Sequence, residues 1–267
     1  LKKLKLRNCL VIQDSELLNL MTPLKVTHLN VDLWCISEIG NVGRHLEHLV
    51  LDRGEENPPA VDDAYFGPYM MPHLKTLKLK GFWRDYLDED DTFVNSLILA
   101  APNLQSFVLE QSDLSSQRAI KIIKSFDLVK FEMALNATDR KEIMVELQKK
   151  PRLQELRIWG HEFTPEELTG YYFPNVRVFH HWMADTKENF DALRKAFPNL
   201  RELVINSHFH PTRVIPYNQE NMWFLTSEYW PNLEYMRIRT LTCVLDMRTK
   251  EMGLKRVSIL DGREVFL

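Results

Sequence analysis

A short pattern of apolar positions recurs along the whole chain: apolar, two variable residues, apolar, one variable residue, apolar. Two apolar residues two positions apart point to the same side of an extended strand, and the variable residues beside them point to the other. The pattern therefore predicts one strand per occurrence. Its eleven occurrences average roughly 25 residues apart and start at Leu1, Val26, Leu46, Leu74, Leu104, Leu128, Leu153, Val176, Leu200, Leu233 and Leu254.

Apolar segments at helical spacing follow several of these strands, for example at Phe190, Leu193 and Phe197. Candidate helix starts precede such segments at Asp14, Ser115, Thr138, Thr164 and Thr186. Thr164 is followed by Pro165 and Glu167, which predicts a capping box. One strand–turn–helix unit cannot bury both of its apolar faces, but stacked units form a continuous core between a parallel sheet and a layer of helices.

Proline marks the start of many units. It stands two positions before the first apolar residue of six units, at Pro72, Pro102, Pro151, Pro174, Pro198 and Pro231. Asparagine follows the proline in four of them, at Asn103, Asn175, Asn199 and Asn232. The same punctuation at the same place in successive units supports the assignment of a repeat.

The first unit adds Cys9, Ile12, Asp14 and Leu17 to its strand pattern. With these residues the sequence resembles a leucine-rich-repeat protein over its whole length. The first unit resembles the cysteine-containing subtype typical of F-box leucine-rich-repeat proteins, and the later units resemble the ribonuclease-inhibitor-like class in length and helix content. The resemblance implies an α/β solenoid shaped as a curved horseshoe, with the parallel sheet on the concave face and helices on the convex face. We expect residues 1–267 to form a single domain, as a fragment of a longer chain.

Composition limits the classes of function. The chain has 267 residues, 38 of them leucine, with 45% hydrophobic and 27% charged residues, which is typical of a globular protein with a sizeable core. A formal net charge of -3 gives no basis for a general nucleic-acid or membrane-surface role. The three cysteines, Cys9, Cys35 and Cys243, lack CxxC spacing, which favours reduced thiols in a cytoplasmic or nuclear protein.

Variable residues of the strands should form rows on the concave face. Tryptophan, tyrosine and arginine are enriched at binding hot spots, and they gather in three of the later units. We predict that the partner-binding residues are Arg157, Trp159, His180, Trp182, Tyr235, Arg237 and Arg239. The alternative is that loops of the chain itself cover Trp159 and Trp182.

Three stretches exceed the repeat length, at residues 52–73, 82–91 and 207–231. Long loops on a rigid scaffold commonly carry recognition, so a protein partner is expected on the concave face or on these insertions. The alternative is that the insertions cover the sheet edge or lengthen a helix.

No catalytic or cofactor motif occurs in the sequence, so we expect a protein that is not an enzyme and uses no cofactor. The acidic run from Asp88 to Asp91 lacks the spacing and glycine of a calcium loop. One histidine group raises the question of a metal site, but it has no cysteine pairs or metalloprotease helix beside it, and we predict none there. Its members are His161, His180, His181, His208 and His210.

The leading hypothesis is the substrate-recognition repeat domain of an F-box-type ubiquitin-ligase receptor, linked to a cullin adaptor through an F-box outside this sequence. The alternative is a non-ligase leucine-rich-repeat scaffold in signalling, immunity or nuclear assembly. An RNA-contacting reading is disfavoured because acidic residues interrupt the basic positions. Those basic positions are Lys3, Lys5, Arg7, Lys78 and Lys80, and the interrupting residues are Asp32, Asp52 and Glu110.

Overall fold

A computed structural model describes the repeats over most of the chain. The described residues are 2–5, 25–32, 43–52, 71–81, 91–110, 114–135, 137–183, 186–206, 229–239, 243–248, 256–259 and 264–265. The chain divides into two compact units, Leu1–Ala134 and Leu135–Leu267. In the described part, none of the helices combines the length and apolar character needed to cross a bilayer.

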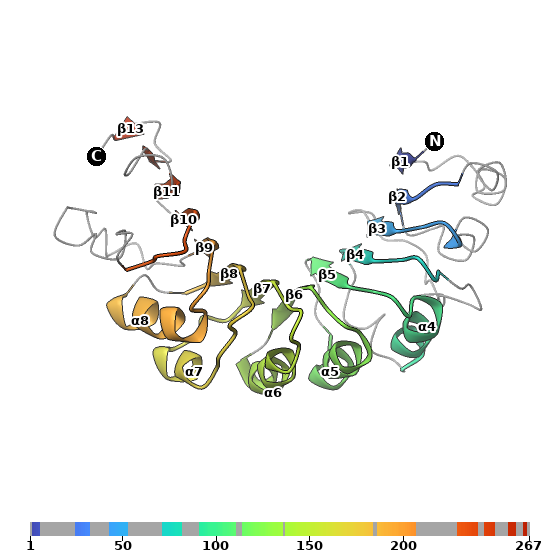
Figure 1. The fold of residues 1–267 in the computed structure, drawn as a ribbon, viewed down its shortest axis with the longest axis horizontal. Helices are drawn as coiled ribbons and strands as arrows, with labels where there is room; N and C mark the ends of the chain where they lie inside the picture. The colour runs from blue at the N-terminus through green and yellow to red at the C-terminus, as the bar shows by residue number, and fades with distance from the viewer. Residues whose placement is uncertain are drawn as a thin grey trace. The chain divides into compact units, whose positions relative to one another are not determined.

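The first unit is built on parallel strands that pair in the order of the sequence. Helices α4 (Thr92–Ala100) and α5 (Ser116–Ser125) lie on one side of these strands (Figure 1). The strands are β1 (Lys3–Lys5), β2 (His28–Asp32), β3 (His48–Asp52), β4 (Thr76–Lys80), β5 (Ser106–Glu110) and β6 (Lys130–Leu135), whose last residue belongs to the second unit.

The second unit repeats this arrangement with four further parallel strands: β7 (Glu155–Gly160), β8 (Val178–Trp182), β9 (Glu202–Asn206) and β10 (Tyr235–Arg239). Helices α6 (Ala137–Gln148), α7 (Pro165–Thr169) and α8 (Lys187–Ala196) lie on one side of the strands (Figure 1). The predicted α/β leucine-rich-repeat solenoid, with strand and helix layers, is confirmed.

The recurring apolar positions form the core, as predicted. In β3 and β4 the pattern residues have an exposed fraction of 0%, and the residues between them are half-buried on the other side of the strand. The same alternation places Leu156 and Ile158 of β7 under the helices. Removing these side chains from water is the main favourable term in the folding of each unit.

Two of the predicted helix starts have the expected hydrogen bonds. The Thr164 hydroxyl accepts from the Glu167 N–H, and the Glu167 carboxylate accepts from the Thr164 N–H, which completes the capping box. The Thr186 hydroxyl accepts from the Asn189 N–H. Ser115 precedes α5 without a capping bond from its side chain. These caps satisfy N–H groups that the first turn of a helix cannot pair internally.

The end of the chain departs from the prediction. The strand expected after Leu254 exists as β12 (Arg256–Ile259), but it is antiparallel to a strand that the pattern did not predict, β11 (Cys243–Arg248). β11 is itself antiparallel to β10, and β13 (Glu264–Val265) is antiparallel to β12. Three residues separate β10 from β11, too few for the crossover that a parallel neighbour requires. Equal spacing of the repeats would have placed Ser258 in one row with Arg237, but Arg237 pairs with Asp246 of β11, and Asp246 pairs with Arg256 of β12.

The Pro-Asn punctuation links consecutive repeats. The Asn103 amide donates to the Pro72 carbonyl at 2.8 Å, and the Asn175 amide donates to the Pro151 carbonyl at 2.9 Å. Asn199 repeats this bond to Pro174 at 2.9 Å, and its own side-chain oxygen accepts from the Asn232 amide at 3.3 Å. Asn103, Asn175 and Asn199 thus each satisfy a backbone carbonyl one repeat earlier, and Asn232 extends the series through the Asn199 side chain.

Replacing Asn199 with alanine should destabilise the fold, because both side-chain bonds of this linking residue are lost. We expect the free energy of unfolding, measured by urea denaturation, to fall by about 1–2 kcal/mol. The control is Asn95→Ala, an exposed residue within α4, which should be neutral or slightly stabilising because alanine is the better helix former. An equal loss in both variants would contradict the linking role.

Candidate partner-binding surface

Strand pairing in the second unit aligns the predicted binding residues. Arg157 of β7 pairs with His180 of β8, which pairs with Val204 of β9, which pairs with Arg237 of β10. This confirms the predicted row across these four strands. We call the side of β7–β10 that faces away from the helices the strand-side surface; its residues include Arg157, Trp159, His180, Trp182, Val204, Tyr235 and Arg237.

A second row lies two residues further along the same strands. Trp182 pairs with Asn206, and Asn206 pairs with Arg239. Trp159 occupies the corresponding position of β7. Both tryptophans are half-buried rather than fully open, whereas Arg237 is exposed. For Arg239 only the backbone position is described. The structure thus brings the predicted residues onto one side of four neighbouring strands.

His180 lies at the centre of this surface with an exposed fraction of only 8%. Its Nε2 is 2.7 Å from Oε1 of Glu202, and its ring meets the Trp159 ring edge-on at a centroid distance of 6.3 Å. Because a carboxylate only accepts, Nε2 carries the proton of the neutral ring. Burial and the nearby Arg157 guanidinium lower the pKa of His180, and they outweigh the opposing effect of Glu202. The ring is therefore neutral at pH 7.

The arginines of the surface have partners within their own strands. The Arg157 guanidinium lies 2.5 Å from the Glu155 carboxylate, two residues earlier in β7. The Arg237 guanidinium carbon lies 5.8 Å from the centre of the Tyr235 ring in β10, a cation–π distance. Both contacts hold long, flexible side chains against the strands.

Directly beneath this surface, His181 is completely buried on the helix side of β8. The Phe163 N–H donates to its Nε2 at 3.1 Å, so the other ring nitrogen, Nδ1, carries the proton and donates to the Ile158 carbonyl at 2.7 Å. Burial lowers the pKa of His181 to about 3. His181 occupies the third apolar position of its repeat, a departure from the pattern that the sequence displays.

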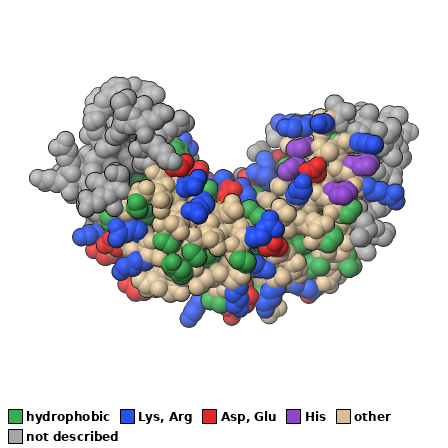
Figure 2. Space-filling model, viewed as in Figure 1, with side chains coloured by type: hydrophobic (Ala, Val, Ile, Leu, Met, Phe, Trp, Pro, Cys, Tyr) green, Lys and Arg blue, Asp and Glu red, His purple; other side chains and the backbone are tan. Residues whose placement is uncertain are grey.

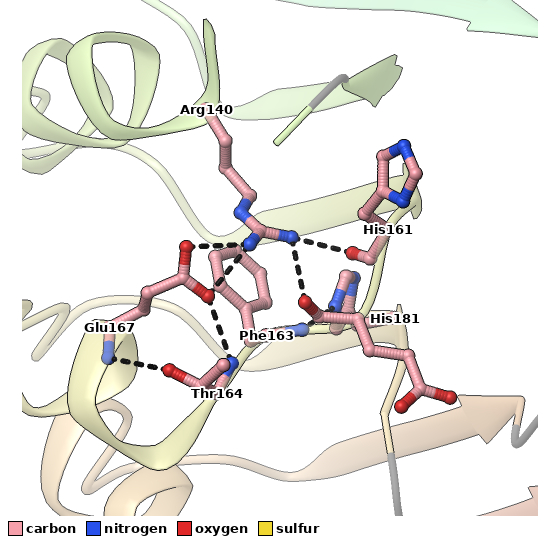
Figure 3. Close-up of polar contacts among 7 residues, drawn as sticks. Arg140, His161, Phe163, Thr164, Glu167 and His181 are labelled. Atoms are coloured by element: carbon pink, nitrogen blue, oxygen red, sulfur yellow. Dashed lines mark hydrogen bonds and ion pairs between the residues drawn. The ribbon is translucent and has the colours of Figure 1, made fainter. Parts of the chain in front are cut away.

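Arg140 of α6 forms hydrogen bonds to the segment that follows Trp159 (Figure 3). Its guanidinium donates to the carbonyls of His161 and Glu162 at 2.5 and 3.1 Å and to both Glu167 carboxylate oxygens at 2.7 Å. Arg140 has an exposed fraction of only 2%. Partial burial would raise the pKa of Glu167, but the bonds from Arg140 and the Thr164 N–H lower it overall. Sequence analysis missed this residue, since nothing in the pattern marks a buried arginine.

Gly160 ends β7 immediately after Trp159. Its φ of 113° lies in a region that side-chain-bearing residues rarely adopt. A Cβ at this position would also collide with the Leu135 carbonyl oxygen. Glycine is therefore required where the chain leaves the strand, directly after Trp159.

The structure separates the histidines that the sequence groups together. His180 and His181 point to opposite sides of β8, and both ring nitrogens of His181 are hydrogen-bonded to backbone groups. His161 is exposed, and His208 and His210 lie outside the described residues. Within the described part of the chain, histidine, cysteine and carboxylate side chains do not assemble into a group of three or more suited to a metal ion.

In the first unit, a histidine pair that sequence analysis did not identify lies on β2 and β3. His28 and His48 pair across the strands, and their rings stack at a centroid distance of 4.2 Å. Burial and the neighbouring His28 lower the pKa of His48. Figure 2 shows the histidines gathered at this part of the first unit. The sequence did contain a signal for this pair, because the two histidines occupy the same position of the strand pattern in consecutive repeats.

Most of each predicted insertion lies outside the described residues, including 53–70, 82–90 and 207–228. Whether those segments cover the tryptophans stays a prediction. Asp91, at the end of the acidic run, precedes α4 and bonds the side chains of Arg118 and Lys121 in α5 at 3.1 and 2.7 Å. This residue therefore joins two helices of the first unit.

Comparison with known proteins identifies the class of fold. No protein-family model matches the chain, and no curated protein sequence matches it. Among solved structures, the chain is similar to the leucine-rich repeat-containing protein LegL7 from Legionella pneumophila, with a TM-score of 0.54. The alignment covers 99% of this chain and 92% of LegL7 at 12% identity. The chain therefore has a leucine-rich-repeat fold, and at this identity the likeness concerns the fold alone.

The buried His181 should make the protein sensitive to acid. The pKa of His181 is about 3 in the folded protein, whereas an ordinary histidine, as in the unfolded chain, has a pKa of 6.5. The unfolded chain therefore binds the proton more readily. Its contribution to stability is complete above pH 6.5 and is lost as the pH falls toward 3, at up to about 1.4 kcal/mol per pH unit. Urea denaturation between pH 7.5 and 5 measures this slope.

His181→Gln keeps one donor and one acceptor but does not titrate. We expect it to be less stable at pH 7.5 by about 1–3 kcal/mol and to lose less stability on acidification. The control His161→Gln changes an exposed ring and should keep the wild-type pH dependence. Equal slopes in all three proteins would show that His181 is not the acid-sensitive group.

Proposed function

We propose that the chain is a protein-binding repeat module, not an enzyme, and that its strand-side surface holds the partner. The observation that carries this proposal is the alignment of Trp159, Trp182 and Tyr235 with Arg157 and Arg237 on one side of four neighbouring strands. These are the residue types that dominate the energy of protein interfaces. The leucine-rich-repeat fold supports the proposal because it presents such residues in regular rows.

The more specific form of the proposal is the substrate-recognition domain of an F-box-type ubiquitin-ligase receptor, acting in the cytoplasm or nucleus. Its support is the resemblance of the first repeat, with Cys9, Ile12 and Asp14, to the cysteine-containing subtype. Those three residues lie outside the described part of the structure. The broader form, a scaffold in signalling, immunity or nuclear assembly, requires only the surface itself.

Trp182→Ala should weaken partner binding while leaving the fold intact. Truncation of a hot-spot side chain costs about 2 kcal/mol, or roughly 30-fold in affinity. Affinity capture from cell extract with quantitative mass spectrometry should show the same protein depleted with Trp182→Ala and with Trp159→Ala. The control Lys149→Ala removes an exposed side chain next to α6 whose described ion pair is with Glu146, three residues away. This variant should capture the partner normally.

Circular dichroism distinguishes a binding role from a packing role. A melting temperature of Trp182→Ala close to that of the wild type, with reduced capture, supports the proposal. A large fall in melting temperature would show that the tryptophans act as core or covered residues. Unchanged capture by both tryptophan variants would contradict the assignment of the surface.

The ubiquitin-ligase form of the proposal has its own test. The full coding sequence that contains this chain should encode an F-box, and capture of the full-length protein should recover the cullin adaptor. Deleting the F-box should abolish recovery of the adaptor and leave capture by the strand-side surface unchanged. If neither an F-box nor the adaptor is found, the ligase form is wrong and the scaffold form is retained.

A further inference from the structure

We infer that the strand-side surface binds an acidic, extended segment of a protein partner, an inference that rests on the proposed protein-binding function. It follows from the unequal placement of charge and aromatic side chains in three rows across β7–β10. The register fixes these rows as Glu155, Val178, Glu202 and Tyr235; then Arg157, His180, Val204 and Arg237; then Trp159, Trp182, Asn206 and Arg239.

Negative charge on these strand positions is confined to the first row. Glu155 lies against Arg157 at 2.5 Å, and Glu202 lies against His180 at 2.7 Å. The second and third rows of the same four strands contain three arginines and no carboxylate. With His180 neutral, these twelve positions carry a formal charge of +1, although the chain as a whole carries -3. A partner with negative charge is therefore attracted to the second and third rows.

The first unit shows a different arrangement on the corresponding side of its strands. Lys78 forms an ion pair with Glu110 of the neighbouring strand, and Lys80 lies 3.7 Å from both Asp52 and Glu110. Opposite charges alternate within one row there, so each is compensated by its neighbour. In the second unit, by contrast, the row that holds both tryptophans has no carboxylate at its positions on β7–β10.

Aromatic and cationic groups together favour a peptide over a nucleic acid. Trp159 and Trp182 offer flat apolar area to the side chains of a peptide, while its carboxylates reach the arginines. A nucleic acid carries a charge on every phosphate, and Glu155 and Glu202 would repel such a continuous chain. A peptide places carboxylates only where its sequence has them. We therefore assign the occupant as a peptide with acidic residues between apolar or aromatic ones.

The test uses two fluorescein-labelled peptides of twelve residues with identical leucine and phenylalanine positions. The charged positions are glutamate in one peptide and lysine in the other. Fluorescence anisotropy on the full chain at low salt should show the acidic peptide binding at least about tenfold tighter than the basic one. The affinity should fall as salt is added, because exposed charges are screened.

Variants locate the binding. Arg237→Gln removes an exposed cation from the second row and should weaken the acidic peptide several-fold, and Trp182→Ala should weaken it about tenfold or more. The matched control Lys80→Gln removes a cation from the strands of the first unit and should leave the affinity unchanged. Circular dichroism of each variant shows whether it is folded, and the exposed Arg237 provides the informative variant if Trp182→Ala is unstable.

Several results would overturn the inference. These are failure of the acidic peptide to bind, equal or tighter binding of the basic peptide, tighter binding of a single-stranded RNA of twelve nucleotides, or an equal effect of Lys80→Gln and Arg237→Gln. The proposed function fails on a different observation, which is unchanged partner capture by the tryptophan variants. Tryptophan-dependent capture without acidic-peptide binding would therefore reject the partner chemistry and retain the binding module.

Discussion

In-register pairing of successive repeats is the constraint on which the rest of each unit depends. A carbonyl just before one strand accepts two N–H groups from the next repeat, as when Arg201 and Glu202 both donate to the Arg177 carbonyl. The asparagine side chains add a bond between the turns of neighbouring repeats, for example from Asn199 to Pro174. The register is strongly constrained, because a shift of one strand by one residue would turn all of its apolar side chains to the wrong face.

The same register brings side chains of different repeats together on one face of the strands. Side chains that are far apart in the sequence, such as His180 and Glu202, become neighbours because their strands are aligned residue by residue. On the other side of β8, His181 and Arg140 replace part of an apolar core with hydrogen-bonded polar groups. Their bonds to backbone carbonyls and N–H groups compensate for the loss of water around buried polar atoms. The polar core and the candidate surface thus share the backbone of β7 and β8.

The predicted strand direction was wrong at the end of the chain, where the sequence departs from the regular repeat. The pattern at Leu254 satisfied the spacing rule, but spacing does not specify strand direction. Direction was decided by the short connection after Arg239, which allows an antiparallel neighbour and not a parallel one. Arg140 was missed for a related reason: an arginine in a helix is ordinarily exposed, and only the packing of α6 beside the segment after β7 gives its guanidinium several acceptors.

The sequence by itself determined the repeat, the faces of its strands and most helix starts, because these depend on periodicity and on local caps such as Thr164 and Thr186. It also determined that Arg157 and His180 share a row, since equal spacing implies equal register. Tertiary structure alone decided the protonation and burial of His180 and His181. Adjacent in sequence, they differ in environment because one faces the strand-side surface and the other the core. Tertiary structure also decided which charges are compensated. Ion pairs form between neighbouring strands, and the separation of two residues in the sequence does not show whether their side chains are in contact.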